Sequence, residues 1–160
     1  MERFDRVGES GRVPMLSLSS IDAEFVGLGQ SWTKVAARLH DHGLVDSEAV
    51  RTCLHNEFYA QWIGNSDRHL GNVSMTVRDT GFALLPAYDM LPMIYAPERG
   101  EIIPRSINYP VRPMQHEDLW QHAGMVAQRF WGRVSQDARV SADFRKLADV
   151  NLVQIRKLMD

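Results

Sequence analysis

The sequence is poor in the features that mark secreted and membrane proteins. Its single cysteine, Cys53, excludes an internal disulfide bond. No apolar run approaches the roughly 20 residues of a membrane-spanning helix. The opening residues are mostly charged and offer no apolar signal-peptide core. We therefore expect a cytoplasmic protein that makes no contact with a membrane.

The chain has no large excess of charge of either sign, and it contains few lysines. The formal net charge is -2, which gives no basic surface for direct binding of nucleic acid. Of the 18 positively charged residues, 15 are arginine and only three are lysine: Lys34, Lys146 and Lys157. This shortage limits any chemistry in which a lysine neutralises phosphate.

What is present is typical of one globular domain. The chain has 160 residues, of which 44% are hydrophobic and 24% are charged. A chain of this length can bury enough surface for a single core. We expect one domain over residues 1–160, mainly helical (α+β class) with one small β-hairpin.

Capping residues and helical periodicity predict most of the secondary structure. Ser31, Asp46 and Ser141 each precede apolar residues at helical spacing and are predicted N-caps, and Gly43 is a natural helix stop. Another helix follows Pro113. Three apolar stripes are predicted: Val50, Cys53, Leu54, Phe58 and Trp62; Leu119, Ala123, Val126 and Phe130, with Trp120, Ala127 and Trp131 beside them; and Phe144, Leu147, Ala148, Leu152, Ile155 and Met159.

The remaining segments predict strands and loops. Residues 73–77 and 82–85 read as two strands, and the Asp and Gly of the intervening turn favour a hairpin. Residues 1–20 are expected to be irregular, with the end of a strand as an alternative for residues 2–6. A short helix is expected at 21–28, with Ser19 or Ser20 as its cap. Five prolines predict a long ordered loop over residues 90–114.

A polar loop, which reads Gly-Asn-Ser-Asp-Arg-His-Leu-Gly-Asn from Gly64 to Asn72, lies between a predicted helix and the hairpin. Asp67 and Asn72 have the spacing of the protein-kinase catalytic loop, in which the Asp orients the acceptor hydroxyl and the Asn holds magnesium. The hairpin returns the chain to this loop, so we expect Asp89 to converge on the same cleft. Loop polar residues that fall at this spacing by chance are the alternative.

The loop, the later run Leu85-Pro86-Ala87-Tyr88-Asp89-Met90-Leu91-Pro92 and the opening Glu2-Arg3-Phe4-Asp5-Arg6 together resemble the HipA-like serine/threonine kinase family. Its members are bacterial toxins of type II toxin–antitoxin pairs. The motifs cover about residues 1–95, and the helical pattern covers the rest. The resemblance implies the helical C-lobe of a protein-kinase-like fold, with residues 1–6 at the hinge between the lobes.

The resemblance also implies roles for individual residues. Asp67 would be the catalytic Asp, Asn72 and Asp89 would hold Mg and through it ATP, and the backbone around Glu2 and Phe4 would meet the adenine. The γ-phosphate of ATP would pass to a hydroxyl of a protein substrate, for which a translation component is one candidate. The implied partner is a DNA-binding antitoxin.

Two parts of such a kinase are absent from the sequence. Gly27-Leu28-Gly29 lacks the third glycine of a Gly-rich loop, and Lys34 lies on a predicted helix after the hinge-like motif rather than on a strand before it. We therefore expect the N-lobe to be missing and this chain alone to be inactive. The alternative function is a non-catalytic binding module that acts through a partner surface, for which residues 90–114 are a candidate.

Other polar and aromatic residues receive simpler interpretations. Arg68 is expected to pair with Asp89, with a phosphate, or in a surface salt bridge. His69 should make a structural hydrogen bond, and Tyr88 should pack against the helical core. The remaining histidines are predicted to lie at the surface or at a solvated helix end without metal partners: His40, His42, His55, His116 and His122.

Overall fold

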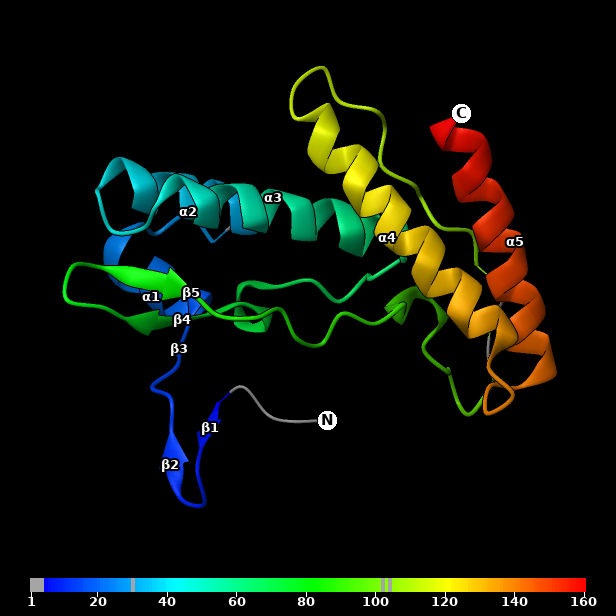
Figure 1. Ribbon diagram of the computed structural model, residues 1–160, viewed down its shortest axis with the longest axis horizontal. Coiled ribbons are helices and arrows are strands. Elements are labelled where there is room, and N and C mark those ends of the chain that lie inside the picture. Colours follow the sequence, from blue (N-terminus) through cyan, green and yellow to red (C-terminus); the bar gives the residue numbers. More distant parts are fainter. Residues whose placement is uncertain (1–4, 30, 102, 104) are drawn as a thin grey trace. The chain divides into compact units, whose positions relative to one another are not determined.

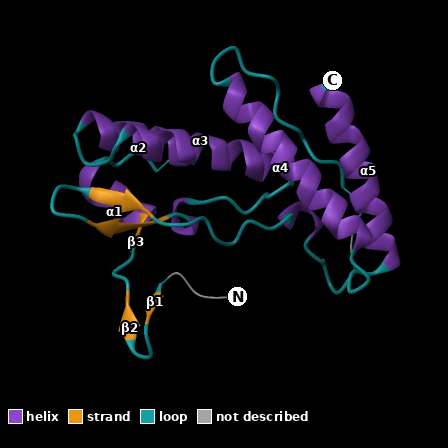
Figure 2. Ribbon diagram, in the orientation of Figure 1, coloured by secondary structure: helices purple, strands orange, loops and turns teal. Residues whose placement is uncertain are grey.

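The computed structural model describes residues 5–29, 31–101, 103 and 105–160. They form five α-helices and two small antiparallel sheets, which confirms the mainly helical α+β class (Figure 1, Figure 2). Contacts divide the chain into two compact units, Met1–Leu54 with Arg68–Asp89 and His55–Asp67 with Met90–Asp160. The assignment of residues 1–160 to one domain stays a prediction.

The first unit holds α1 (Leu18–Phe25), α2 (Trp32–Asp41) and a three-stranded sheet in the order β3-β4-β5. The predicted hairpin is confirmed as β4 (Ser74–Val77) and β5 (Phe82–Leu84). β3 (Leu16–Ser17) pairs with β4, and a second hairpin joins β1 (Arg6–Val7) to β2 (Gly11–Arg12). We expected these segments to be irregular, because a two-residue strand is too short to show alternation of side chains.

Side-chain caps start the helices. The predicted N-caps are confirmed, since each side chain accepts the backbone N–H three residues on: Ser31 before α2, Asp46 before α3 (Ser47–Trp62) and Ser141 before α5 (Ala142–Met159). The first helix starts earlier than expected. Its cap is Ser17, whose hydroxyl accepts from the Ser20 backbone N–H at 3.1 Å, so Ser19 and Ser20 lie inside the helix.

The turn of the β4–β5 hairpin requires glycine. Gly81 has a φ of +81°, and a Cβ there would lie 2.2 Å from the carbonyl oxygen of Leu44. The same oxygen accepts a hydrogen bond from the Phe82 backbone N–H at 2.7 Å. This close approach fastens the hairpin to the connection between α2 and α3.

The second unit is built on α4 (Glu117–Gln136) and α5, which pack side by side (Figure 1). Its core contains the following buried residues: Trp62, Ile63, Tyr95, Ile107, Trp120, Ala123, Ala127, Trp131, Ala148 and Ile155. One polar side chain, Asn151, is buried among them. Its amide oxygen accepts from the hydroxyls of Tyr95 and Tyr109 at 3.2 and 3.0 Å, which removes the cost of burying it.

The residues predicted on the apolar side of α4 are buried to different degrees. Trp120, Ala127 and Trp131, which we placed beside the main stripe, are buried, whereas Val126 and Phe130 are only half-buried. Periodicity identifies an apolar face but not its centre, and here the large indole rings occupy the enclosed positions. The α3 stripe shows the same effect: Cys53 and Trp62 are buried, and Val50, Leu54 and Phe58 are half-buried.

The long loop predicted over residues 90–114 is confirmed for its described residues. It contains one short 3-10 turn, η2 (Met93–Tyr95), and is anchored by Tyr95 and Ile107, which are 4% and 8% exposed. In the described part of the chain no helix combines the length and the apolar character needed to cross a membrane.

Candidate functional site

The polar loop begins in the second unit. The backbone N–H of Asn65 donates to the Ala60 carbonyl at 2.8 Å, and the Asn65 side-chain oxygen accepts from the Asp67 backbone N–H at 3.1 Å. A side chain bonded to the backbone two residues on is an Asx turn. Asn65 is buried and Asp67 is exposed, so this turn leaves the Asp67 carboxylate at the surface.

The loop continues in the first unit with a 3-10 turn, η1 (Leu70–Asn72), which two reciprocal bonds close. Nδ1 of His69 accepts from the Gly71 backbone N–H at 3.0 Å, and Oδ1 of Asn72 accepts from the His69 backbone N–H at 3.1 Å. A Cβ at Gly71 would lie 2.8 Å from that ring nitrogen, which explains the glycine. The structural role predicted for His69 is confirmed, because its ring caps the turn.

Asn72 and Asp89 meet directly. Nδ2 of Asn72 donates to Oδ2 of Asp89 at 3.2 Å. Asn72 is buried, whereas Asp89 is exposed and has a φ of 56°, in the left-handed region. Asp67 belongs to the other unit, so its convergence on this pair stays a prediction. Glu2 and Phe4, the predicted adenine contacts, lie outside the described residues.

Tyr88 holds the chain before Asp89 against the polar loop. Its hydroxyl donates to the Gly71 carbonyl at 2.8 Å and lies 2.8 Å from the Ser74 hydroxyl. Because the phenol proton is used on Gly71, the Ser74 hydroxyl donates to the phenol oxygen. These bonds describe the hydroxyl alone, so the prediction that the Tyr88 ring packs against the helical core stays a prediction.

A second support for the loop comes from α2. The indole N–H of Trp32 donates to the His69 carbonyl at 2.8 Å. Sequence analysis missed both this contact and that of Tyr88, and no local signal could have found them, because 37 and 17 residues separate the partners. The aromatic residues therefore fix the backbone that carries Asn72 and Asp89.

Of the three alternatives for Arg68, two are not found. In the described part of the chain its guanidinium forms neither an ion pair nor a hydrogen bond, so it pairs neither with Asp89 nor in a surface salt bridge, and a contact with a phosphate stays a prediction. An exposed, unpaired arginine inside a polar loop is available to an anion.

The donor set at Asn72 and Asp89 fits a magnesium ion. A carboxylate and an amide oxygen are the hard ligands that magnesium prefers, and it commonly takes only one or two from the protein. Oδ1 of Asn72 uses one lone pair on the His69 N–H, and a carbonyl oxygen has two. Among the described residues no group of three His, Cys, Asp or Glu side chains could hold a metal ion.

The second unit contains a pair of histidines in contact. Nδ1 of His122 lies 2.9 Å from Nε2 of His55, and Nδ1 of His55 lies 3.4 Å from the Asn56 side-chain oxygen. Since an amide oxygen only accepts, the His55 proton sits on Nδ1, and Nε2 accepts from the His122 N–H. Sequence spacing could not show this pair, because 67 residues separate its members.

The histidine pair predicts a pH dependence of stability. Burial, and then the charge of His122, lower the pKa of His55 below its ordinary value of 6.5, while the bond to Asn56 opposes them. In the window below pH 6.5 the unfolded chain binds more protons at this position, so the free energy of unfolding should fall as the pH falls. Urea titrations at about pH 7.5 and 5.5 measure it. His55→Gln should remove part of the loss, and His42→Gln, at an exposed position, should not; equal losses in all three proteins would contradict the assignment.

Comparison with known proteins identifies related sequences. Residues 1–151 match the family described as HipA-like C-terminal domain. A protein of Escherichia coli (strain K12) named Toxin YjjJ is 36% identical to this chain over 158 residues. The aligned region covers 98% of this chain but 36% of that protein, so the chain spans little more than a third of its relative.

Proposed function

The chain belongs to the family of HipA-like C-terminal domains, and from that premise we propose that it is the magnesium-binding and substrate-binding lobe of a serine/threonine protein kinase. The observation that carries the proposal is the bond between Asn72 and Asp89. It brings the amide nitrogen of Asn72 against the Asp89 carboxylate, so the two side chains lie together, and Asn72 follows Asp67 at the spacing used by kinase catalytic loops.

In the proposed reaction, the oxygen of a serine or threonine hydroxyl forms a bond to the γ-phosphorus of ATP. The bond from that phosphorus to the β–γ bridging oxygen breaks, and ADP leaves. The Asp67 carboxylate holds the hydroxyl in line and accepts its proton. Asp67 is suited to this role because it is exposed and its backbone is held by the Asx turn of Asn65.

Asn72 and Asp89 would hold the magnesium ion, which when bound offsets the charge on the phosphate oxygens. The surrounding residues keep these two side chains in place. His69 fixes Oδ1 of Asn72, and Tyr88 ties the backbone before Asp89 to Gly71. The unpaired Arg68 is a candidate contact for a phosphate of the nucleotide.

The biological setting belongs to the same proposal. The relative from Escherichia coli carries the name toxin. This chain is 36% identical to it over 98% of the length of this chain. We place the chain in a toxin of a toxin–antitoxin pair, in the cytoplasm, with a DNA-binding antitoxin as partner and a protein hydroxyl as substrate.

The proposal predicts that this 160-residue chain binds ATP–magnesium weakly, with a dissociation constant above about 1 mM. The reason is that its sequence supplies neither a Gly-rich loop nor a strand lysine, so half of the phosphate cradle is absent. Isothermal titration calorimetry measures the affinity. A longer protein that adds both parts should bind ATP, and should lose that binding when Asn72 is changed to Ala.

Two results would count against the proposed kinase function. Low-micromolar affinity of the 160-residue chain for ATP would contradict the argument from the absent cradle. Binding by the longer protein that is unaffected by Asn72→Ala would remove Asn72 from the site and favour the non-catalytic binding module.

A further inference from the structure

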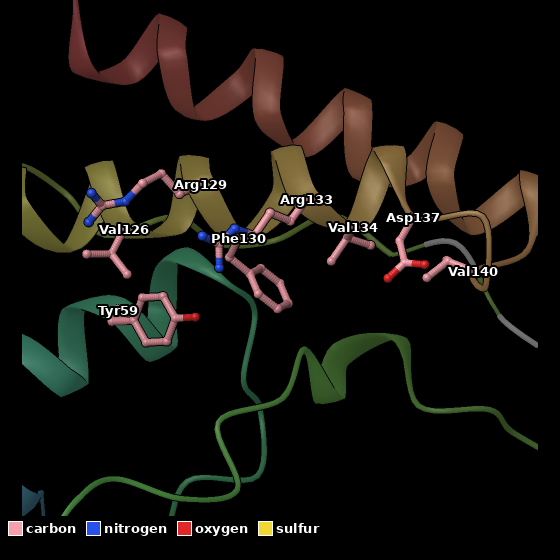
Figure 3. A pocket seen from close by; sticks show the side chains of 8 residues that line it. All are labelled: Tyr59, Val126, Arg129, Phe130, Arg133, Val134, Asp137 and Val140. Atoms are coloured by element: carbon pink, nitrogen blue, oxygen red, sulfur yellow. The ribbon is translucent and has the colours of Figure 1, made fainter. Parts of the chain in front are cut away.

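A groove in the second unit has no role in the proposed kinase chemistry, because its lining contains none of the residues assigned to that chemistry. Its volume is about 550 Å³ (Figure 3). It is lined by one residue of α3, five of α4 and two of the connection to α5: Tyr59, Val126, Arg129, Phe130, Arg133, Val134, Asp137 and Val140.

The floor of the groove is apolar. Val126, Phe130 and Val134 follow one another at intervals of four residues along α4, and Val140 lies beyond the end of the helix. All four are half-buried rather than buried. Phe130 and Val134 pack against the edge of the core, and the two tryptophans of α4 take its enclosed positions, so this apolar face of α4 remains partly open.

Two arginines of α4 line the groove next to these apolar residues. Arg129 and Arg133 are exposed and lie one helical turn apart. Neither guanidinium has an ion pair or a hydrogen bond within the described residues. Other arginines of the same unit are paired: Arg105 with Glu98, Arg112 with Glu117, and Arg139 with Asp137.

Asp137, the carboxylate in the groove lining, does not pair with Arg129 or Arg133. Asp137 is bonded by Arg139 at 2.6 Å, and the bonds from Arg139 lower the pKa of Asp137 to about 2. Asp137 therefore stays ionised and committed to Arg139 at neutral pH.

A neutral hydrogen-bond donor completes the lining. The Tyr59 hydroxyl has no partner among the described residues. Every buried side-chain nitrogen or oxygen there does have one, so this hydroxyl must reach solvent. Figure 3 shows the Tyr59 ring on α3 facing the side chains of α4. Burial of the ring raises the pKa of Tyr59, so the group donates rather than repels an anion.

We propose that this groove docks a partner protein through a segment that combines carboxylates with an apolar side chain. The apolar side chain would cover Phe130 and Val134, and two carboxylates would pair with Arg129 and Arg133. The arginines are separated by a rise of about 6 Å along α4, which matches two acidic residues one turn apart on a helix.

Charge and shape favour an acidic peptide over a nucleic acid. The basic residues of the groove lining are Arg129 and Arg133, which are too few to follow a phosphate backbone, and three of its apolar residues are valines, which do not stack on bases. The groove accepts a few side chains, and two guanidiniums suffice for two carboxylates. This inference does not depend on the kinase proposal, because it uses none of the residues assigned there.

The test is a selection of random peptides displayed on phage against the 160-residue chain. We expect enrichment of sequences with two Asp or Glu residues one turn apart beside a large apolar residue. Synthetic peptides from the selection should lose about tenfold in affinity for Arg129→Gln and for Arg133→Gln, because each change removes one charge pair. Arg156→Gln, an exposed change on α5, is the matched control and should bind as well as the original chain.

Three outcomes would overturn the proposal. These are a selection without acidic residues, selected peptides that bind the Arg129→Gln and Arg133→Gln variants undiminished, and an equal loss in the Arg156→Gln control. A single-stranded oligonucleotide that competes more strongly than the selected peptides would reject the peptide class. The arginine variants change exposed side chains only, so all of them should fold, and circular dichroism checks this.

Discussion

Asp67→Asn should lower phosphoryl transfer by about 10³-fold in a longer protein that joins this chain to a Gly-rich loop and a strand lysine. The amide matches the carboxylate in size but cannot accept the hydroxyl proton. Asp67 is exposed, and only its backbone N–H is bonded in the Asx turn, so the fold should persist. The measurement is transfer of labelled γ-phosphate from ATP to a protein substrate, with the melting temperature recorded on the same samples.

Asp79→Asn is the matched control for that experiment. Asp79 is an exposed carboxylate in the hairpin turn, and its loss should change neither activity nor melting temperature. Near-normal transfer by Asp67→Asn would show that Asp67 is not catalytic. A large drop in its melting temperature would instead make Asp67 a structural residue.

Asp89→Asn should behave differently from Asp67→Asn. The new amide oxygen can still accept from Nδ2 of Asn72, and asparagine tolerates the left-handed φ of 56° at this position. The variant loses a negative ligand, so activity should fall at low magnesium and return in part at high magnesium. An activity loss that magnesium does not change would argue against Asp89 as a metal ligand.

Trp131→Ala is expected to cost about 3–5 kcal/mol of unfolding free energy, a large part of the stability of a typical domain. Trp131 is fully buried in the second unit. Its ring centroid lies 6.2 Å from that of Tyr95 and 5.0 Å from that of Phe130, and its indole N–H donates to the Trp62 carbonyl at 3.4 Å. The substitution therefore leaves a cavity and an unpaired carbonyl.

Urea unfolding followed by circular dichroism measures this cost. Met125→Ala on the same helix is the control, since Met125 is 49% exposed and its loss should change stability by less than about 0.5 kcal/mol. Equal effects of the two substitutions would show that the tryptophan cluster does not form the core. Val50, on the predicted α3 stripe, is a weaker probe because it is half-buried.

Local sequence determined the longer helices, the β4–β5 hairpin and the residues that make up the polar loop. Ser31, Asp46 and Ser141 cap their helices through bonds to the third residue along, and the Asp-Thr-Gly turn closes the predicted hairpin. Such interactions join residues close in the chain, so their chemistry can be read without the fold. The spacing of Asp67, Asn72 and Asp89 was visible in the same way.

Tertiary structure alone decided which side chains support that loop and which face of α4 stays open. Trp32 reaches the His69 carbonyl across 37 residues, and His122 reaches His55 across 67. The sequence also left the centre of the α4 stripe undetermined, so it did not show that Val126 and Phe130 line a groove. Packing decides such cases, because an apolar face on one helix is buried only where a neighbouring element covers it.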